Sequence, residues 1–273
     1  MSSIAAIGSL SRDVVAGGAP RPGGAVFYAA RALAAIGAHA RIAAACAREH
    51  RDELLPPLEA FGLPVEWHES AETTAYSFHY EGERRIMRQE AVADPWSPEQ
   101  AVAAIGDATW IHVGALVRSD FPVETLAALS GGGRQLLVDA QGLVRTAALG
   151  PLQTDGEIGD ALRYVAILKL NDEEAHTLAG TAEPAALQGL GVPEVILTLG
   201  SQGSFVITLA AVEHVPPRVV VGPVDPTGAG DTFSATYLTS RARGLRPAEA
   251  AGEATVAVAA FLSRCRTRAG WFS

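Results

Sequence analysis

Short apolar runs alternate with stretches of helical periodicity along most of this chain, and this alternation restricts the fold more than any other feature. Apolar runs at residues 3–8 and 41–46 are each followed by a helical segment that ends at a glycine. Parallel strands need crossover connections of this kind, and the connecting helices cover both faces of the sheet. Similar apolar runs recur at residues 109–113, 135–139, 164–168 and 194–198. We therefore expect an α/β fold with a doubly wound, mostly parallel sheet and helices on both faces.

A different pattern interrupts the alternation between residues 64 and 92. Large or β-branched side chains stand there at every second position, namely Thr74, Tyr76, Phe78 and Tyr80. Period-two alternation around a tight turn predicts an antiparallel hairpin. We expect residues 64–92, with a contribution from 12–22, to form a small β-sheet lid on a single domain that spans residues 1–273.

The aromatic face of this lid needs a cover, because an exposed apolar sheet face promotes association. The cover is either a bound substrate or a second subunit, and the second case predicts a homodimer through the lid. The alternative is an ordinary edge hairpin that packs on its own domain.

Composition excludes several classes of protein. The 273 residues carry a net charge of −9, and this argues against a nucleic-acid partner, which requires a basic footprint. No apolar run is long enough to span a bilayer, and the first residues lack the pattern of a secretion signal. Cys46 and Cys265 lie far apart and form no metal or redox motif. We expect a cytoplasmic protein with reduced cysteines and no membrane partner.

Residues 224–233 read Val-Asp-Pro-Thr-Gly-Ala-Gly-Asp-Thr-Phe and lie between an apolar run at 219–221, expected to be a strand, and an amphipathic helix. The first N–H groups of a helix are unpaired and attract anions. Gly228 and Gly230 allow the backbone to approach a ligand closely. This stretch therefore predicts an anion-binding loop.

Asp231 is unexpected in such a loop, because its carboxylate would repel a bound phosphate. It is explained if the carboxylate takes a proton from a substrate hydroxyl while the amides of Gly228, Ala229 and Gly230 hold the charge of a transferring phosphoryl group. The alternative is a glycine-rich turn in which Asp231 caps the helix.

Lys169 is the only lysine of the chain, and no G-x-x-x-x-G-K pattern surrounds it. A Walker-type P-loop is therefore excluded. We expect arginine or a bound metal to supply any positive charge that acts on phosphates.

The string Asp-Pro-Thr-Gly-Ala-Gly-Asp-Thr-Phe at residues 225–233 resembles the signature of the ribokinase-like (PfkB) family of carbohydrate and nucleoside kinases. The resemblance implies an ATP-dependent phosphotransferase with an alcohol group as acceptor. It also implies that Asp231 is the base, and that Thr227, Gly228 and Gly230 lie along the ATP phosphates. In this family a monovalent cation such as K⁺ often binds near the loop, here near Asp225.

Two further motifs match the family. Asn171 and Glu174 fit its N-x-x-E motif, in which the glutamate helps to position Mg²⁺ through water; the alternative is a simple helix cap. Thr198, Gly200 and Gly203 fit its T-x-G-x-x-G nucleotide loop, and the alternative there is a hairpin turn.

The resemblance also implies an acceptor site in the first half of the chain. Asp13 matches a residue that holds substrate hydroxyls, although it is also a plausible turn residue. Gly23 and Gly24 match the glycines that open the first helix. Tyr28 replaces the asparagine of ribokinases, and this departure weakens a furanose or nucleoside interpretation.

A D-x-Q-G-x-x-R run begins at residue 139 and resembles the myo-inositol kinase-like branch of the family. Gln141 and Arg145 would then reach toward the acceptor or its product phosphate. The sequence thus predicts a kinase for a small polyol, either a cyclitol or a sugar. The alternatives are a nucleoside or other heterocyclic-alcohol kinase of the same family, and a non-catalytic ligand-binding regulator.

Overall fold

Two β-sheets organise the computed structural model, which describes residues 3–15, 17–81, 84–222 and 224–265. The strands of the large sheet are β1 (Ile4–Ser9), β4 (Ala40–Ala47), β5 (Val65–Ser70), β8 (Trp110–Gly114), β9 (Gln135–Asp139), β11 (Ile167–Asn171), β12 (Glu194–Thr198), β13 (Ser204–Thr208) and β14 (Val212–Val215). Their spatial order is β14-β13-β12-β11-β9-β8-β1-β4-β5. The pairs from β12 through β5 are parallel, whereas β13 and β14 pair antiparallel.

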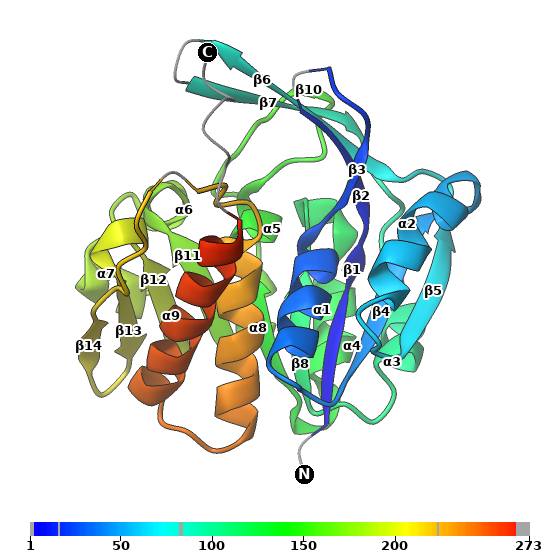
Figure 1. Ribbon diagram of the computed structural model, residues 1–273. Helices are drawn as coiled ribbons and strands as arrows, with labels where there is room; N and C mark the ends of the chain where they lie inside the picture. The colour runs from blue at the N-terminus through cyan, green and yellow to red at the C-terminus, as the bar shows by residue number, and fades with distance from the viewer. Residues whose placement is uncertain (1–2, 16, 82–83, 223, 266–273) are drawn as a thin grey trace.

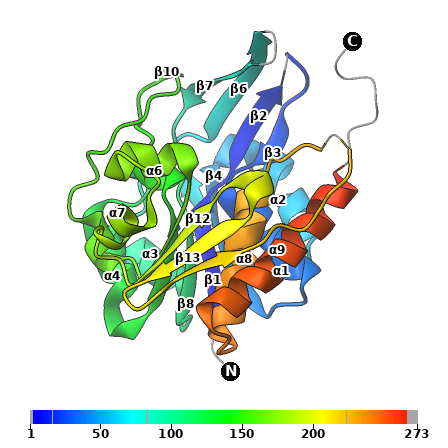
Figure 2. The same cartoon turned by 90° about the vertical axis from the view of Figure 1, so that its left-hand side faces the viewer.

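Helices cover both faces of this sheet (Figures 1 and 2). They are α1 (Ala25–Ala35), α2 (Arg51–Glu59), α3 (Pro98–Ile105), α4 (Val123–Ser130), α5 (Gln141–Val144), α6 (Asp172–Ala179), α7 (Pro184–Gln188), α8 (Ala229–Ala242) and α9 (Pro247–Arg264). One apolar core joins the sheet to α3, α4, α6 and α7. A second joins the other face to α1, α2, α8 and α9. The doubly wound α/β fold predicted from the sequence is therefore confirmed.

The small sheet lies beyond the carboxyl ends of the parallel strands (Figure 1). Its strands are β2 (Ser11–Val15), β3 (Arg21–Gly23), β6 (Thr74–Glu81), β7 (Arg84–Ala91) and β10 (Gly150–Pro151), in the order β10-β7-β6-β2-β3. Residues 12–22 thus contribute to it. The expected lower boundary at residue 64 is wrong, because residues 65–70 form β5, which pairs with β4 in the large sheet.

Two aromatic side chains of β6 are buried within their own chain. Tyr76 and Phe78 are 3% and 6% exposed, and they pack in one cluster with Ala25 and Leu116. The expectation that these rings require a substrate or a second subunit as cover is therefore wrong for Tyr76 and Phe78. The side chain of Tyr80 lies outside the described residues.

Residues 219–221 do not form the strand that their apolar character predicted. They lie in an irregular segment between β14 and α8, and Val219 and Val221 are 89% and 72% exposed. No sheet neighbour covers them, so their β propensity is not realised. Helix α8 therefore starts from an irregular loop rather than from a strand.

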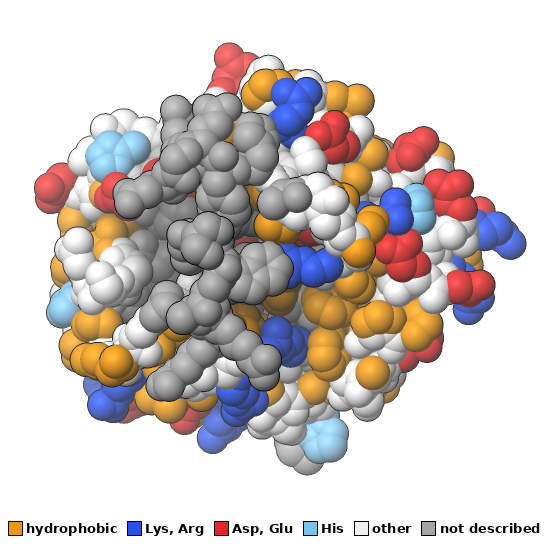
Figure 3. Space-filling model, turned by 45° about the horizontal axis from the view of Figure 1, so that its top comes forward, with side chains coloured by type: hydrophobic (Ala, Val, Ile, Leu, Met, Phe, Trp, Pro, Cys, Tyr) orange, Lys and Arg blue, Asp and Glu red, His pale blue; other side chains and the backbone are white. Residues whose placement is uncertain are grey.

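The coloured surface in Figure 3 carries basic and acidic side chains that are interspersed. A nucleic-acid partner would favour a continuous basic patch, and no such patch is visible in the coloured part of this view. Within the ranges described above, no helix is long and apolar enough to cross a membrane.

A buried polar contact fixes α8 to the edge of the parallel sheet. Tyr237 is fully buried, and its hydroxyl donates a hydrogen bond of 2.6 Å to Glu194 Oε1 at the start of β12. Arg241, one turn further along α8, pairs with the same carboxylate at 3.1 Å. The bond orients the helix whose first turn carries the signature residues.

We expect Tyr237→Phe to destabilise the protein by about 1.5–3 kcal/mol, because a hydrogen bond to a charged group is lost in a buried place. Urea unfolding followed by circular dichroism measures this change. Tyr164→Phe is the control, because no hydrogen bond of the Tyr164 hydroxyl is found among the described residues. Equal stability of the two variants would show that the Glu194 contact does not fix α8.

Candidate active site

The signature loop lies over the point where the connections of the sheet change direction. β1 pairs with β4 on one side and with β8 on the other. The chain moves outward from β1 to β5 and then returns to β8, which makes a topological switch point between β1 and β8. Ligands of open α/β sheets bind at such a point, outside the carboxyl ends of the strands. Helix α8 contacts β1, β8 and β9 there.

Both glycines of the loop have close neighbours, and Gly228 is required by its own. Gly228 precedes α8 with φ of 85°, and a Cβ on it would collide with the ring of Tyr28. A Cβ on Gly230 would lie 2.8 Å from Lys169 Nζ. The predicted start of a helix at this loop is confirmed, and the capping position belongs to Gly228 rather than Asp231.

Asp231 is the third residue of α8, and its surroundings place its ionisation near neutral pH. Burial and then the charge of Asp139 raise the pKa of Asp231 to about 7, although His112, Lys169 and Arg145 oppose the increase. A carboxyl group with this pKa accepts and releases protons readily near pH 7. The site therefore contains a group suited to general base catalysis.

Asp139, at the end of β9, is the centre of a buried polar cluster. Lys169 Nζ lies 2.7 Å from Asp139 Oδ1. Ser234 Oγ donates to Asp139 Oδ2 at 2.8 Å, and His112 Nε2 lies 3.3 Å from the same oxygen. Burial alone would raise the pKa of Asp139, but Lys169 and His112 lower it to about 2. Asp139 is therefore an anion at neutral pH.

The expectation that arginine or a bound metal supplies the positive charge that acts on phosphates stays a prediction, but the structure adds a further cation beside the signature loop. The single lysine, Lys169, points to the signature loop from β11, as its position relative to Gly230 shows. Sequence reasoning missed Lys169, His112 and Ser234, because residues on different strands meet only in the folded chain. One signal in the sequence pointed to the ion pair: Asp139 and Lys169 each lie near the end of an apolar strand run.

Three of these groups satisfy the distance requirement for a metal site. Ligand atoms of His112, Asp139 and Asp231 lie within 4.8 Å of one another. The ammonium of Lys169 already neutralises Asp139 there. A second cation beside it would be repelled, so we regard the cluster as a polar network rather than a metal centre.

Asn171 and Glu174 form a reciprocal cap at the start of α6. Asn171 Oδ1 accepts from the backbone N–H of Glu174, and Glu174 Oε2 accepts from that of Asn171, both at 2.9 Å. The structural explanation for the motif is thus sufficient by itself. Burial raises the pKa of Glu174 even though Lys169 opposes the increase. The negative charge of Glu174 is thus only partly offset by Lys169. Such a carboxylate suits a hydrated Mg²⁺, which usually takes one or two protein carboxylates.

The residues expected to bind nucleotide lie beside this cap. Thr198 ends β12 and is the register partner of Asn171 on β11. Gly200 and Gly203 follow with φ of 55° and 92°, and the carbonyl oxygen of Val215 leaves no room for a Cβ on Gly203.

The segment before α8 has its own local structure. The backbone N–H of Thr227 donates to Asp225 Oδ1 at 3.0 Å. The bond forms a tight turn directly before the signature glycines. Whether this turn also holds a monovalent cation stays a prediction.

The predicted acceptor residues of the first half meet at the same loop. A Cβ on Gly23 would collide with Asp13 Oδ2, so the Asp13 carboxylate lies against this glycine. Burial, followed by the charges of Asp13, Asp231 and Asp225, raises the pKa of Tyr28 to about 12. Tyr28 therefore lies near Asp13 and Asp231. Gly24, with φ of 99°, is the N-cap of α1, and a Cβ on it would collide with the carbonyl oxygen of Ser9.

Arg145 lies near the site, whereas the role of Gln141 stays a prediction. The positive charge of Arg145 is among the groups that lower the pKa of Asp231, Glu174 and Tyr76. It therefore connects the lid with the proposed base. Gln141 begins α5 two residues after Asp139.

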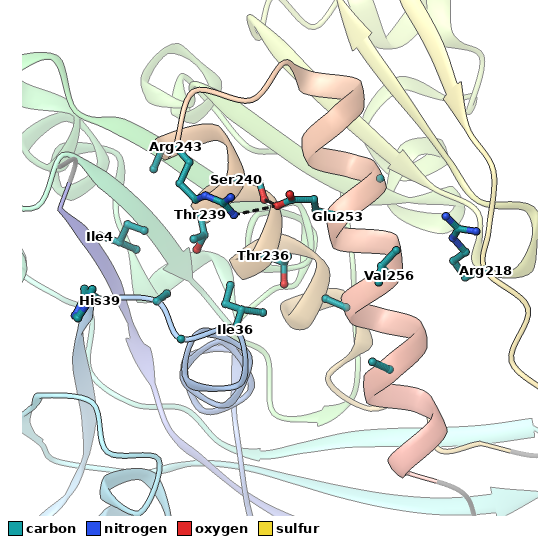
Figure 4. A pocket seen from close by; sticks show the side chains of 16 residues that line it. Ile4, Ile36, His39, Arg218, Thr236, Thr239, Ser240, Arg243, Glu253 and Val256 are labelled. Carbon is teal, nitrogen blue, oxygen red and sulfur yellow. Dashed lines mark hydrogen bonds and ion pairs between the residues drawn. The ribbon is translucent and has the colours of Figure 1, made fainter.

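A separate cavity of about 1160 Å³ lies between α1, α8 and α9. Figure 4 shows Ile36, Thr236 and Val256 around it. No residue that the sequence predicted for the site lines this cavity. The candidate active site is therefore the region at the strand ends.

Solved structures that superpose on this chain show which fold it has. A pyrophosphate-dependent kinase in the ribokinase family, complexed with a pyrophosphate analog and myo-inositol, superposes with a TM-score of 0.80 at 25% identity, covering 96% of this chain and 95% of that one. Arabidopsis thaliana ribokinase complexed with ribose and ATP superposes with a TM-score of 0.75 at 17% identity, covering 96% and 93%. The fold is that of the ribokinase family.

Sequence comparison then shows the family directly. The model of the pfkB family carbohydrate kinases matches residues 12–268, and the chain belongs to this family. Inositol 3-kinase of Zea mays is 30% identical over 207 residues, which are 72% of this chain and 50% of the maize protein. Ribokinase of Bacillus subtilis (strain 168) is 26% identical over 264 residues, 89% of this chain and 87% of that protein. The match thus spans about half the length of the maize relative.

The family is one of carbohydrate kinases, and one of its solved relatives uses pyrophosphate as the phosphoryl donor. The family resemblance predicted from the signature loop is confirmed.

Gly228→Ala tests whether the loop requires its conformation. We expect turnover to fall by at least about tenfold, because a side chain at φ of 85° is strained and its Cβ would displace Tyr28. Gly244→Ala is the matched control, since Gly244 has φ of 89° with nothing within 4 Å of a Cβ. Steady-state kinetics and melting temperatures of both variants provide the measurement. Equal turnover in the two variants would contradict a role for the Gly228 geometry.

Proposed function

We propose that this protein transfers the γ-phosphate of ATP to a hydroxyl of a small polyol, a cyclitol such as myo-inositol or a sugar. The observation that carries the proposal is the position of Asp231. Its carboxyl group has a pKa of about 7, follows the anion-binding loop and lies near Tyr28 and Asp13. A base next to a phosphoryl-binding loop and an acceptor site is the arrangement that alcohol phosphorylation needs.

Asp231 acts as the general base in this mechanism. Its carboxylate takes the proton of the acceptor hydroxyl while the acceptor oxygen forms a bond to the γ-phosphorus. The bond between that phosphorus and the bridging oxygen breaks, and ADP leaves. The amides of Gly228, Ala229 and Gly230 stabilise the negative charge on the transferring group. The small sheet excludes water, which otherwise competes as acceptor.

ATP extends from the signature loop toward β12 in this proposal. Thr227, Gly228 and Gly230 contact its phosphates, and Thr198, Gly200 and Gly203 hold the remainder of the nucleotide. Glu174 would hold a hydrated Mg²⁺ through water, and Asn171 fixes the orientation of Glu174 through the cap. The ion, when bound, would offset the charge of the phosphates.

The acceptor lies between Asp13, Gly23 and Tyr28. A carboxylate that accepts hydrogen bonds from neighbouring hydroxyls suits a vicinal diol. The ring of Tyr28 adds an apolar wall that an asparagine would not supply. Gln141 and Arg145 contact the acceptor or its product phosphate.

Two relatives support a cyclitol as acceptor, namely the maize inositol 3-kinase and the structure complexed with myo-inositol. The Bacillus subtilis ribokinase supports a sugar.

Other expectations from the sequence are kept as proposals. A monovalent cation binds near Asp225 and Thr227, the protein acts in the cytoplasm, and nucleic acid is not a partner. We also propose a homodimer through the lid. Tyr76 and Phe78 would not form its contact, because both are buried within their own chain. The rival functions are a nucleoside kinase and a non-catalytic regulator.

The decisive experiment is phosphate transfer measured across acceptors and donors. We expect ATP with Mg²⁺ to phosphorylate myo-inositol, another cyclitol or a simple sugar, and Asp231→Asn to lower kcat by about 10²–10⁴-fold. Asp160→Asn, at an exposed aspartate, is the control.

The donor panel includes inorganic pyrophosphate, because one structural relative depends on it. Transfer from pyrophosphate but not from ATP would overturn the proposed donor. Transfer only to nucleosides would select the rival kinase, and a folded protein without any transfer would favour the regulator.

The pH dependence follows from the pKa of Asp231. Only the ionised carboxylate accepts a proton, so we expect kcat/KM to fall about tenfold per pH unit below a midpoint near pH 7 and to level off above it. Initial rates in constant-ionic-strength buffers from pH 5 to 9 measure this limb. A flat profile across pH 7 would contradict Asp231 as the base.

A further inference from the structure

Lys169 extends from β11 to the signature loop as an almost fully buried cation. Its side chain is 9% exposed, and its ammonium lies 2.7 Å from Asp139 Oδ1. The same ammonium lies 2.8 Å from the place where Gly230 would carry a Cβ. One positive charge thus stands between a buried anion and the backbone proposed to bind the phosphoryl group.

Stability does not explain this ion pair well. Removing two charges from water is unfavourable, and well-packed apolar residues often replace a buried pair without loss of stability. The pair lies at the carboxyl end of the sheet beside the first turn of α8, where negative charge must be bound. Its position therefore points to a role in the reaction.

On the basis of the function proposed above, we propose that Lys169 is a positioning residue that supplies a fixed positive charge to the phosphoryl-binding loop, and that Asp139 holds it there. Its ammonium adds to the partial positive charge of the α8 N-terminus. The interaction is strong because the site is buried and water is largely excluded. Ser234 keeps Asp139 oriented through its 2.8 Å hydrogen bond from α8.

The same two charges act on Asp231 in opposite directions. The Asp139 carboxylate raises the pKa of Asp231, and the Lys169 ammonium lowers it. The other groups that face Asp231 are His112 from β8, Arg145 from the segment after α5 and Tyr28 from α1.

Because the two charges shift the pKa of Asp231 in opposite directions, their removal should shift the pH profile in opposite directions, which a purely structural role would not do. We expect Lys169→Met to lower kcat by about 10²-fold or more, and to move the acidic limb of kcat/KM upward by about one pH unit. Asp139→Asn should move the limb downward by a similar amount. Lys169→Arg keeps the charge and should recover part of kcat with the limb near its original position. Unchanged limbs in both charge-removing variants, or shifts in the same direction, would overturn the proposal.

The double variant Lys169→Met with Asp139→Asn guards against misfolding, because it leaves no unpaired charge in the interior. We expect its melting temperature to approach that of the wild type while kcat stays at least about 10²-fold reduced. A folded double variant with nearly normal turnover would overturn the proposal. Absence of transfer by the wild type across all donors and acceptors would instead contradict the proposed function, so the two failures are distinguishable.

Discussion

The pairing of Lys169 with Asp139 is the interaction around which the buried polar cluster of this site is arranged. A general base must be buried enough for its pKa to rise, yet it must still ionise near neutral pH. Burial and Asp139 supply the increase for Asp231, and Lys169 limits it. Without the ammonium, the Asp139 carboxylate and Asp231 would repel each other in a dry environment. The ion pair allows Asp139, at the end of β9, and Asp231, in the first turn of α8, to lie close together.

The fold is what brings these charges together. Asp139 ends β9, and Lys169 is its register partner on the neighbouring parallel strand β11, although thirty positions separate them in sequence. The switch point between β1 and β8 leaves the space that the first turn of α8 fills. Tyr237 and Glu194 then fix the same helix to β12. Helix α8, which carries Asp231, is thus fixed to the sheet at two points, to β9 through Ser234 and to β12 through Tyr237.

Local signals in the sequence predicted the elements of the site that are formed by neighbouring residues. The signature glycines, the N-x-x-E cap and the alternation of strands and helices belong to this kind, because capping and turn conformation depend on nearby residues. The contacts of Lys169, His112 and Ser234 could not be predicted, because they form between elements distant in sequence. The same limit explains why residues 65–70 were assigned to the lid although they pair with β4 in the large sheet, and why residues 219–221 were wrongly expected to be a strand. Strand formation depends on the partners that a segment finds.

Tyr28 lies between the proposed acceptor site and the signature loop. Its ring occupies the space that a Cβ on Gly228 would need, and its hydroxyl lies among the carboxylates of Asp13 and Asp231. An asparagine at this position would supply two polar groups on a shorter side chain and would leave the loop without this wall. Under the proposed function, in which Tyr28 also contacts the acceptor, a substitution at this position would change both the acceptor site and the support of the loop. The proposal therefore implies that acceptor specificity is coupled to the geometry of phosphoryl transfer.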